Sequence, residues 1–350
     1  MNAKKILVTG GTGYIGSHTV IDLIEKGYDV YIIDNLSNSH VEVLDAIEKI
    51  SGKRPFFANI DLVNKTAVNE FLRVHSIDAI IHFAAFKNVG ESVSMPLEYY
   101  RNNLFSLVNL LELCRDHAIK NFVFSSSCSV YGQPDRLPID EFAETKPAQC
   151  PYANTKKIGE DILKDTVKAV DMNVISLRYF NPVGAHPSAL NGEYPIGAPL
   201  SLVPVVTQTA IGRRKSLMVF GSDYNTPDGS CIRDYIHVMD IAAAHVVAIE
   251  RMISGKSKSR YELFNLGTGK GLSVFEIIHA FEKISGVKLN YEVTDRREGD
   301  VEQVYADTTY ANNELGWKAV RGIDDMIATA WAWEQALQKR SASAIINSKL

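Results

Sequence analysis

The sequence predicts an α/β fold, in which a doubly wound parallel sheet is followed by a smaller C-terminal α/β domain. Short apolar segments alternate with amphipathic helical segments through the first half of the chain, as in parallel sheets covered by helices. The first apolar segment, at 5–9, runs directly into a glycine-rich turn. With 350 residues, of which 46% are hydrophobic, the chain is long enough for two domains.

The glycine-rich turn has the spacing of a dinucleotide-binding loop. It follows a continuous apolar strand and precedes a helix expected over 17–26. Its glycines permit a tight turn, close approach of a pyrophosphate and close packing of helix on sheet. The first amides of the helix then face the phosphates. The turn residues expected to contact a cofactor are Gly10, Gly13, Tyr14, Ile15 and Gly16.

An acidic residue ends the second expected strand, at 29–33. Asp34 occupies the position at which a dinucleotide fold binds the adenosine ribose, and its charge would repel a 2′-phosphate. An unrelated surface aspartate is the alternative, but the ordered series of strand, glycines, helix, strand and acid argues against it. The sequence therefore predicts a Rossmann-type domain that binds NAD rather than NADP.

Further strands and helices continue the alternation. Strands are expected over 55–60, 77–83 and 121–127, with helices over 98–117 and 151–170. Ligands bind beyond the carboxyl ends of the strands in such sheets, and residues near these ends are therefore further candidates for the NAD site. These candidates are Asn35, Ser37, Asn38, Asp61, Leu62, Phe83, Ala84, Ala85, Lys87 and Asn102.

A tyrosine and a lysine on the expected helix at 151–170 are the candidates for catalysis. Tyr152 and Lys156 are four residues apart and therefore share one helix face. A phenol has a pKa of about 10, and a nearby ammonium favours the phenolate, which could accept a proton from a substrate hydroxyl. Ser127, at the end of the strand at 121–127, could hydrogen-bond the same oxygen. These residues and the glycine turn are expected at one edge of the sheet, which distinguishes the pair from a chance match.

Composition argues against several other classes of protein. The net charge of −4 and the absence of a basic run argue against a nucleic-acid partner. No segment approaches the ~20 apolar residues that cross a membrane, and the N-terminus is interpreted as a strand rather than a signal peptide. Four cysteines lack metal-binding spacing, and His82 is interpreted as a core histidine. We therefore expect a cytoplasmic protein without a metal site.

A series of motifs extends this interpretation. The motifs in order are TGGTGYIG (9–16), SSS (125–127), VYG (130–132), YANTK (152–156), LRYFNPVGAHP (177–187), RDYIHVMD (233–240) and RREGD (296–300). With these motifs, the chain resembles UDP-galactose 4-epimerases from about residue 4 to about residue 335. These enzymes are extended short-chain dehydrogenases/reductases. The resemblance implies reversible epimerisation at C4 of UDP-glucose and UDP-galactose, through a transient 4-ketose and enzyme-bound NADH.

The resemblance also implies roles for the three candidate catalytic residues. Tyr152 would take the proton of the 4-hydroxyl as C4 gives a hydride to the tightly held NAD. Lys156 would bind the nicotinamide ribose and lower the pKa of the phenol, and Ser127 would hydrogen-bond the 4-oxygen. The 4-ketose would then rotate and receive the hydride on its other face.

The second half of the chain supplies candidates that could hold the nucleotide sugar. Phe180 is expected against the nicotinamide, and Asn181 follows it at the end of an expected strand. Met218, Val219 and Phe220 form an apolar edge suited to uracil. The predicted substrate-binding residues are Lys87, Ser127, Tyr152, Asn181, Ser201, Leu202, Met218, Val219, Phe220, Arg233, Arg297, Asp300 and Val304.

Two arginines are expected to clamp the pyrophosphate. Arg233 and Arg297 have forked donors suited to phosphates and are expected to pair with the acids Asp234, Glu298 and Asp300. The alternative role for each arginine is a salt bridge on the surface or between the domains, without contact to the pyrophosphate.

Two positions depart from the epimerase pattern. The family commonly carries Asn-Asn-Leu where this chain has Leu200, Ser201 and Leu202, and a tyrosine that restricts the pocket to plain hexoses where this chain has Val304. Both changes leave more space in the sugar pocket for a 2-acetamido group, and we therefore expect the protein to accept UDP-N-acetylhexosamines as well as UDP-glucose.

The predicted organisation has three parts. Residues 1–180 form the NAD-binding domain, which segments near 234–266 rejoin, and 181–340 form the UDP-sugar domain. Residues 341–350 are expected to be a flexible tail. The helices at 98–117 and 151–170 carry apolar stripes that could form a homodimer interface or be buried within one subunit.

Two alternative functions share parts of this pattern. Sugar-nucleotide 4,6-dehydratases and decarboxylases share the fold, but they typically place an acid just after the catalytic Ser or Thr, where this chain has Cys128 and Ser129. A non-catalytic NAD-binding sensor or scaffold would be expected to lose Tyr152 or Lys156, and both are present.

Overall fold

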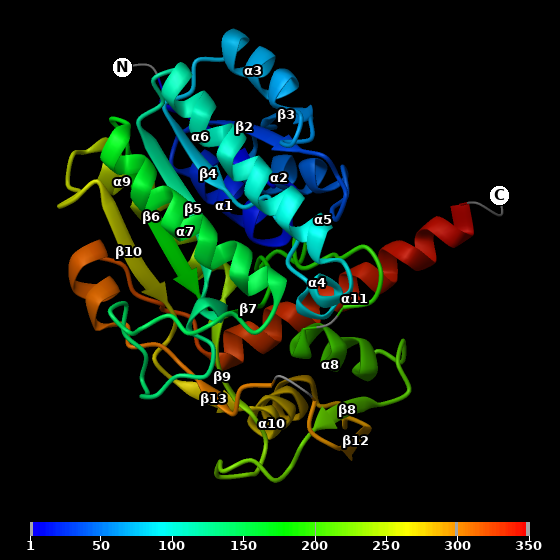
Figure 1. Cartoon of the computed structure of the whole chain (residues 1–350). Coiled ribbons are helices and arrows are strands. Elements are labelled where there is room, and N and C mark those ends of the chain that lie inside the picture. The colour runs from blue at the N-terminus through cyan, green and yellow to red at the C-terminus, as the bar shows by residue number, and fades with distance from the viewer. Residues whose placement is uncertain (1–2, 200, 298–299, 348–350) are drawn as a thin grey trace.

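Seven parallel strands form the central sheet of the computed structural model, which describes residues 3–199, 201–297 and 300–347 (Figure 1). The strand order reverses between β1 and β4, which places a crevice at the carboxyl ends of these two strands. In spatial order the strands are β10 (Tyr261–Leu266), β6 (Asn173–Tyr179), β5 (Asn121–Ser127), β4 (Ala79–His82), β1 (Lys5–Thr9), β2 (Asp29–Asp34) and β3 (Phe56–Asn59).

Helices cover both faces of this sheet because alternate strand residues point to opposite sides. In β1, Ile6 and Val8 pack in one apolar core and Leu7 packs in the other. The predicted doubly wound fold is therefore confirmed. The first core is closed by α1 (Tyr14–Glu25), α2 (Val43–Ser51) and α9 (Val238–Ile253), and the second by α3 (Lys65–Val74), α6 (Ser106–Asp116) and α7 (Pro151–Ala169).

The segment predicted as one helix over 98–117 is helical but irregular. Following α4 (Val89–Ser94), α5 (Pro96–Tyr100) passes into a π-helical turn at Arg101–Phe105 before α6 begins. Turns of this kind inside α-helices frequently occur at functional sites. Here the π-helical turn carries Asn102, one of the predicted cofactor residues.

The smaller part of the chain is built around β9 (Ile232–His237) and lies below the large sheet in Figure 1. Its apolar core is closed by three helices and by a separate pair of strands. β9 pairs with β7 (Asn181–Val183), β11 (Gly271–Ser273) and β13 (Gln303–Val304), β8 (Leu217–Phe220) pairs with β12 (Tyr291–Thr294), and the helices are α8 (Leu202–Ala210), α10 (Val274–Ser285) and α11 (Ile323–Asn347).

The chain crosses between the two parts more than once. β9 belongs to the small sheet, whereas α9 returns to pack against α1 and β10 adds to the large sheet beside β6. The expectation that segments near 234–266 rejoin the large domain therefore applies to α9 and β10 but not to β9. The assignment of the two parts to cofactor and substrate stays a prediction.

The C-terminal helix is longer than the sequence predicts. A tail was expected from residue 341, but the backbone of α11 is helical to Asn347, and 348–350 lie outside the described residues. The apolar residues that the sequence shows between 327 and 337 indicate where the helix packs but do not mark where it ends. None of the helices in the described part of the chain is long and apolar enough to cross a membrane.

Candidate active site

A cleft follows the carboxyl ends of β1, β2 and β4, where the strand order reverses. All predicted cofactor residues line this cleft except Ser127 and Phe180. Of the predicted substrate residues, Lys87 and Tyr152 line it as well. The sheet topology therefore brings the glycine turn, the acid of β2 and the tyrosine–lysine pair of α7 into one cavity.

The glycine turn is so closely packed that side chains would not fit. A Cβ atom on Gly16 would lie 2.2 Å from the carbonyl oxygen of Gly10. Gly10 itself has a φ of 71°, and a Cβ there would lie 2.7 Å from the backbone nitrogen of Ala84. This close approach of bare backbone leaves a cradle at the start of α1, which fits a pyrophosphate.

Asp34 is fixed at the far end of the cradle. Its Oδ2 accepts a hydrogen bond from the Thr12 amide at 3.2 Å, and its Oδ1 accepts from the Leu36 amide at 2.9 Å and from Ser39 Oγ at 3.3 Å. The carboxylate is 9% exposed and also lines the cleft. Carboxylate oxygens in this position accept hydrogen bonds from ribose hydroxyls. The residues present therefore fit NAD.

The catalytic candidates lie at the opposite end of the cleft. Pro151 begins α7, and the next turn places Tyr152 and Lys156 in the cavity, with side chains that are 8% and 5% exposed. The Lys156 ammonium donates to the carbonyl oxygen of Ser125 at 2.7 Å. Ser127 Oγ accepts from the Ser129 amide at 3.2 Å, which leaves its own proton available to a ligand.

Burial controls the protonation of both residues. It raises the pKa of Tyr152 well above that of a free phenol, and the Ser127 hydroxyl opposes this shift. Burial also lowers the pKa of Lys156 to about 8, against the attraction of Glu160. Loss of hydration is the largest effect on the pKa of both groups, and the expectation that Lys156 lowers the pKa of the phenol stays a prediction.

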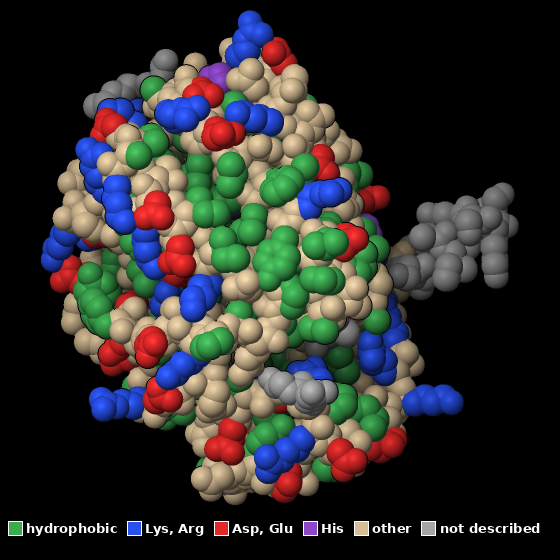
Figure 2. Space-filling view, in the orientation of Figure 1, with side chains coloured by type: hydrophobic (Ala, Val, Ile, Leu, Met, Phe, Trp, Pro, Cys, Tyr) green, Lys and Arg blue, Asp and Glu red, His purple; other side chains and the backbone are tan. Residues whose placement is uncertain are grey.

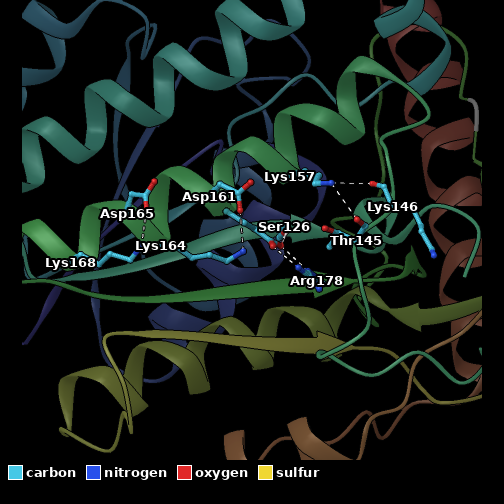
Figure 3. A network of polar contacts seen from close by, with 10 residues as sticks. Ser126, Thr145, Lys146, Lys157, Asp161, Lys164, Asp165, Lys168 and Arg178 are labelled. Atoms are coloured by element: carbon cyan, nitrogen blue, oxygen red, sulfur yellow. Dashed lines mark hydrogen bonds and ion pairs between the residues drawn. The ribbon is translucent and has the colours of Figure 1, made fainter.

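A buried ion pair fixes α7 on the sheet. Glu160, two turns after Tyr152, accepts from Arg178 of β6 through Nε at 2.8 Å and Nη2 at 2.5 Å. Ser126 Oγ of β5 adds a third bond, at 2.6 Å. Figure 3 shows Ser126 and Arg178 together beneath α7, with exposed pairs such as Lys164 and Asp161 along the helix. The face of α7 that bears the catalytic candidates is thereby held against both strands.

The two arginines predicted to bind the pyrophosphate share one acid. Arg297 Nη2 lies 2.6 Å from Asp300 Oδ1, and Arg233 Nη2 lies 3.8 Å from the same oxygen. The guanidinium of Arg297 also lies over the ring of Phe220, 5.5 Å from its centroid. The pairing of Asp234 with an arginine was wrong, and Glu298 lies outside the described residues.

Asp234 instead joins two returning segments. It accepts from the Thr268 amide and hydroxyl at 2.9 and 2.6 Å, from the Gly269 amide at 3.1 Å and from the Ala306 amide at 3.2 Å. The side chain is fully buried. Adjacency in sequence suggested a partner for Arg233, but residues of β9 alternate between faces, and Asp234 therefore points away from it.

Several predicted contact residues point into apolar cores. Phe180 and Val304 pack in the same buried cluster, while Tyr179 rather than Phe180 lines the cleft. Val219 is also buried, whereas its neighbours Met218 and Phe220 are each 40% exposed. Asn181 begins β7, Ser201 precedes the first turn of α8, Leu202 packs on the small core, and Leu200 lies outside the described residues.

The sequence prediction missed one wall of the cleft. The segment 192–195 comes from the smaller part of the chain and lines the cleft near α1, where the preceding Asn191 donates to Ser17. Glu193 pairs there with Lys87 at 3.2 Å. No local pattern marks this segment, because its position depends on contacts with residues more than a hundred positions away. Also missed were Thr12, Ser17, Ile33, Ser39, Val43, Ile60, Phe86, Ser106 and Tyr179.

Comparisons with known proteins agree with this geometry. The chain matches the family model described as GDP-mannose 4,6 dehydratase over residues 7–330. It is 48% identical over 331 residues to the UDP-glucose 4-epimerase of Dictyostelium discoideum, covering 94% of this chain and 95% of that protein.

Two solved structures are similar over nearly the whole chain. The UDP-glucose 4-epimerase from Stenotrophomonas maltophila, with bound NAD and formylated UDP-arabinopyranose, has a TM-score of 0.93 and 43% identity, covering 96% of this chain and 99% of that one. The enzyme from Bifidobacterium longum, in complex with NAD⁺ and UDP, has a TM-score of 0.91 and 45% identity, covering 95% and 98%.

We expect Gly16→Ala to abolish the cradle. The added methyl group must displace backbone, which costs roughly 1–3 kcal/mol of unfolding free energy, and the amides that face the phosphates move. NAD affinity, measured by calorimetric titration of cofactor-stripped protein, should fall at least about tenfold, or ~1.4 kcal/mol. Gly322→Ala is the control, because no atom lies within 4 Å of its added methyl group. Equal NAD affinity in the two variants would contradict the cradle.

Proposed function

The chain belongs to the UDP-glucose 4-epimerase family, and from this premise we propose that it interconverts UDP-glucose and UDP-galactose with NAD as cofactor. The observation that supports this function most strongly is the meeting of Tyr152, Lys156 and the glycine turn in one cleft. The glycine cradle and Asp34 would hold the cofactor, with the tyrosine–lysine pair at its reactive end.

The side chains of the site have complementary roles in this reaction. When bound, NAD accepts a hydride from C4 of the sugar and returns it, so that it is not consumed. Tyr152 accepts the proton of the 4-hydroxyl and later gives it back. Ser127, whose oxygen already accepts from an amide, donates its proton to the 4-oxygen and steadies the developing carbonyl. Lys156, held by Ser125, supplies a cation beside the phenol.

The residue after Ser127 argues against the alternative of dehydration. Elimination requires a group that can transfer a proton at this position, and Cys128 is a thiol whose pKa burial raises to about 12. Cys128 and Ser129 therefore provide no carboxylate next to the reacting sugar. The presence of both Tyr152 and Lys156 in the cleft likewise argues against a non-catalytic NAD-binding protein.

Tyr152→Phe tests the proposed chemistry. The purified protein, without added NAD, should convert UDP-galactose to UDP-glucose with no net formation of NADH. Loss of the proton acceptor should lower kcat by roughly 10²–10⁴-fold, while bound NAD, measured by chromatography of the denatured protein, stays unchanged. Tyr99→Phe serves as the control, because Tyr99 is also buried but donates to Glu91 on the helix before it and does not line the cleft. Full activity of Tyr152→Phe would overturn the assignment.

We also propose that 2-acetamido sugars are substrates. Val304 of β13 pairs with Arg233 of β9, a predicted substrate-binding residue, and this neighbourhood supports the proposal. Its side chain is smaller than the tyrosine that limits related pockets, and Ser201 offers a small side chain at the second position. Val304 packs in the buried cluster with Phe180, where its small side chain fills less space than a tyrosine would, and together with Ser201 this supports a pocket that is open to an acetamido group.

Val304→Tyr tests the breadth of the pocket. The wild-type protein should epimerise UDP-N-acetylgalactosamine as well as UDP-galactose. The variant should lose at least about tenfold, or ~1.4 kcal/mol, on the acetamido sugar and retain activity on UDP-galactose, which serves as the internal control for folding. If the wild-type protein acts on UDP-galactose alone, the proposal about the pocket fails and the epimerase assignment stands.

A homodimer is the proposed assembly. Hydrophobic side chains gather on the face over α4, α6 and α7 in Figure 2. The exposed hydrophobic side chains between the start of α4 and α6 are Val89, Val93, Met95, Leu97, Phe105 and Val108, which are between 38% and 76% exposed. A contiguous apolar surface of this kind is typical of an interface.

We also propose a cytoplasmic location. The four cysteines are free thiols, which are typical of proteins in reducing compartments.

Leu97→Glu should produce a monomer, because a charge in the centre of an apolar interface loses its hydration without gaining a partner. Analytical ultracentrifugation at micromolar concentration measures the change. Val320→Glu is the matched control, since Val320 is equally exposed, at 76%, but lies just before α11 rather than on this face. A monomeric wild-type protein, or an equal effect of both substitutions, would contradict the proposed interface.

A further inference from the structure

Two contacts join the opposite rims of the cofactor cleft. The ring of Tyr194 stacks on His40, with centroids 4.1 Å apart and an interplanar angle of 25°. Oε1 of Glu193 lies 3.2 Å from Nζ of Lys87. His40 and Lys87 belong to connections that follow β2 and β4, whereas Glu193 and Tyr194 belong to the smaller part of the chain. Segments far apart in sequence therefore meet across the cleft.

The segment that bears Glu193 and Tyr194 is firmly anchored at its base. Trp333 Nε1 of α11 donates to the carbonyl oxygen of Glu193 at 2.9 Å. The Trp333 ring also covers Gly192, where an added Cβ would lie 2.5 Å from it. Asn191 is 2% exposed, and its Nδ2 donates to Ser17 Oγ of α1 at 2.9 Å. Movement of this segment away from the cleft must therefore break contacts with both parts of the molecule.

The position of these contacts relates them to the cofactor. Glu193 and Tyr194 line the cleft together with the glycine turn and with Asp34 and Ser39 on the rim next to His40. A dinucleotide on the cradle would thus lie beneath both contacts. We propose that Glu193 and Tyr194, with their partners Lys87 and His40, form a clasp that slows the release of NAD.

The clasp has two elements of different kinds. Tyr194 is 45% exposed, and its stacking on His40 joins the rims through an aromatic contact that does not depend on charge. In the ion pair, the Glu193 side chain is 12% exposed and that of Lys87 is 52% exposed. Water and salt therefore screen this pair, which makes it weaker than the aromatic stack and sensitive to salt. The stack should therefore contribute more to retention than the ion pair.

The experiment measures the release of NAD from the purified holoprotein. The protein is diluted into buffer with an NAD glycohydrolase, which destroys free NAD, and the bound NAD that remains is quantified over time by chromatography. Tyr194→Ala and His40→Ala should each release NAD roughly tenfold faster than the wild type. The double variant should release it no faster than either single variant, because both substitutions remove the same contact. Glu193→Gln should accelerate release to a smaller extent.

Two controls separate retention from general destabilisation. Phe142→Ala removes another exposed aromatic contact, with Tyr310, and should leave the release rate unchanged. Thermal unfolding of the stripped proteins reports any effect on the fold itself. Release at the wild-type rate from Tyr194→Ala, His40→Ala and Glu193→Gln, or fully additive effects of the first two, overturns the clasp. The measurement needs no turnover, and the loss of epimerase activity would not be mistaken for failure of the clasp.

Discussion

The position of the catalytic candidates depends on one buried ion pair. Glu160 and Arg178 are 2% and 3% exposed in their side chains, and the fork of the guanidinium meets both carboxylate oxygens. Removing one partner of such a pair typically costs about 3–5 kcal/mol, because the other charge is left buried. Since the pair joins α7 to β6, and Ser126 joins the same carboxylate to β5, it holds Tyr152 in register with Ser127. The matched pair of Arg251 and Glu262 fixes α9 to β10 in the same way.

The burial that fixes this geometry also opposes the chemistry. It favours the neutral forms of both Tyr152 and Lys156, as the directions of their pKa shifts show. Because the pKa of the Lys156 ammonium is lowered to about 8, the group keeps its charge below that pH and loses it above. In the protein alone, the phenol of Tyr152 is therefore protonated, and the neighbouring Lys156 gives up its proton more readily than a free lysine. Positive charge near the phenol, from Lys156 and from a bound nicotinamide, would favour its ionised form against this loss of hydration.

The local parts of the site were predictable from the sequence, and the long-range parts were not. The cradle, Asp34 and the spacing of Tyr152 and Lys156 each follow from a few consecutive residues, whose strand or helix fixes where they point. Val219 was misplaced because an apolar triplet does not reveal which residue of a strand faces the core. The wall at 192–195 could not be predicted, because Trp333 and Ser17 determine its position from distant parts of the chain. The same limitation applies to Asp234.

Asp234 links the two parts of the molecule at the point where the chain passes between their sheets. Its carboxylate, in β9, accepts hydrogen bonds from amides of the segment that leaves β10 and from the amide of Ala306, two residues after β13. β10 belongs to the large sheet, and β9 and β13 belong to the small one. One buried carboxylate therefore joins both sheets at the point where the chain passes between them.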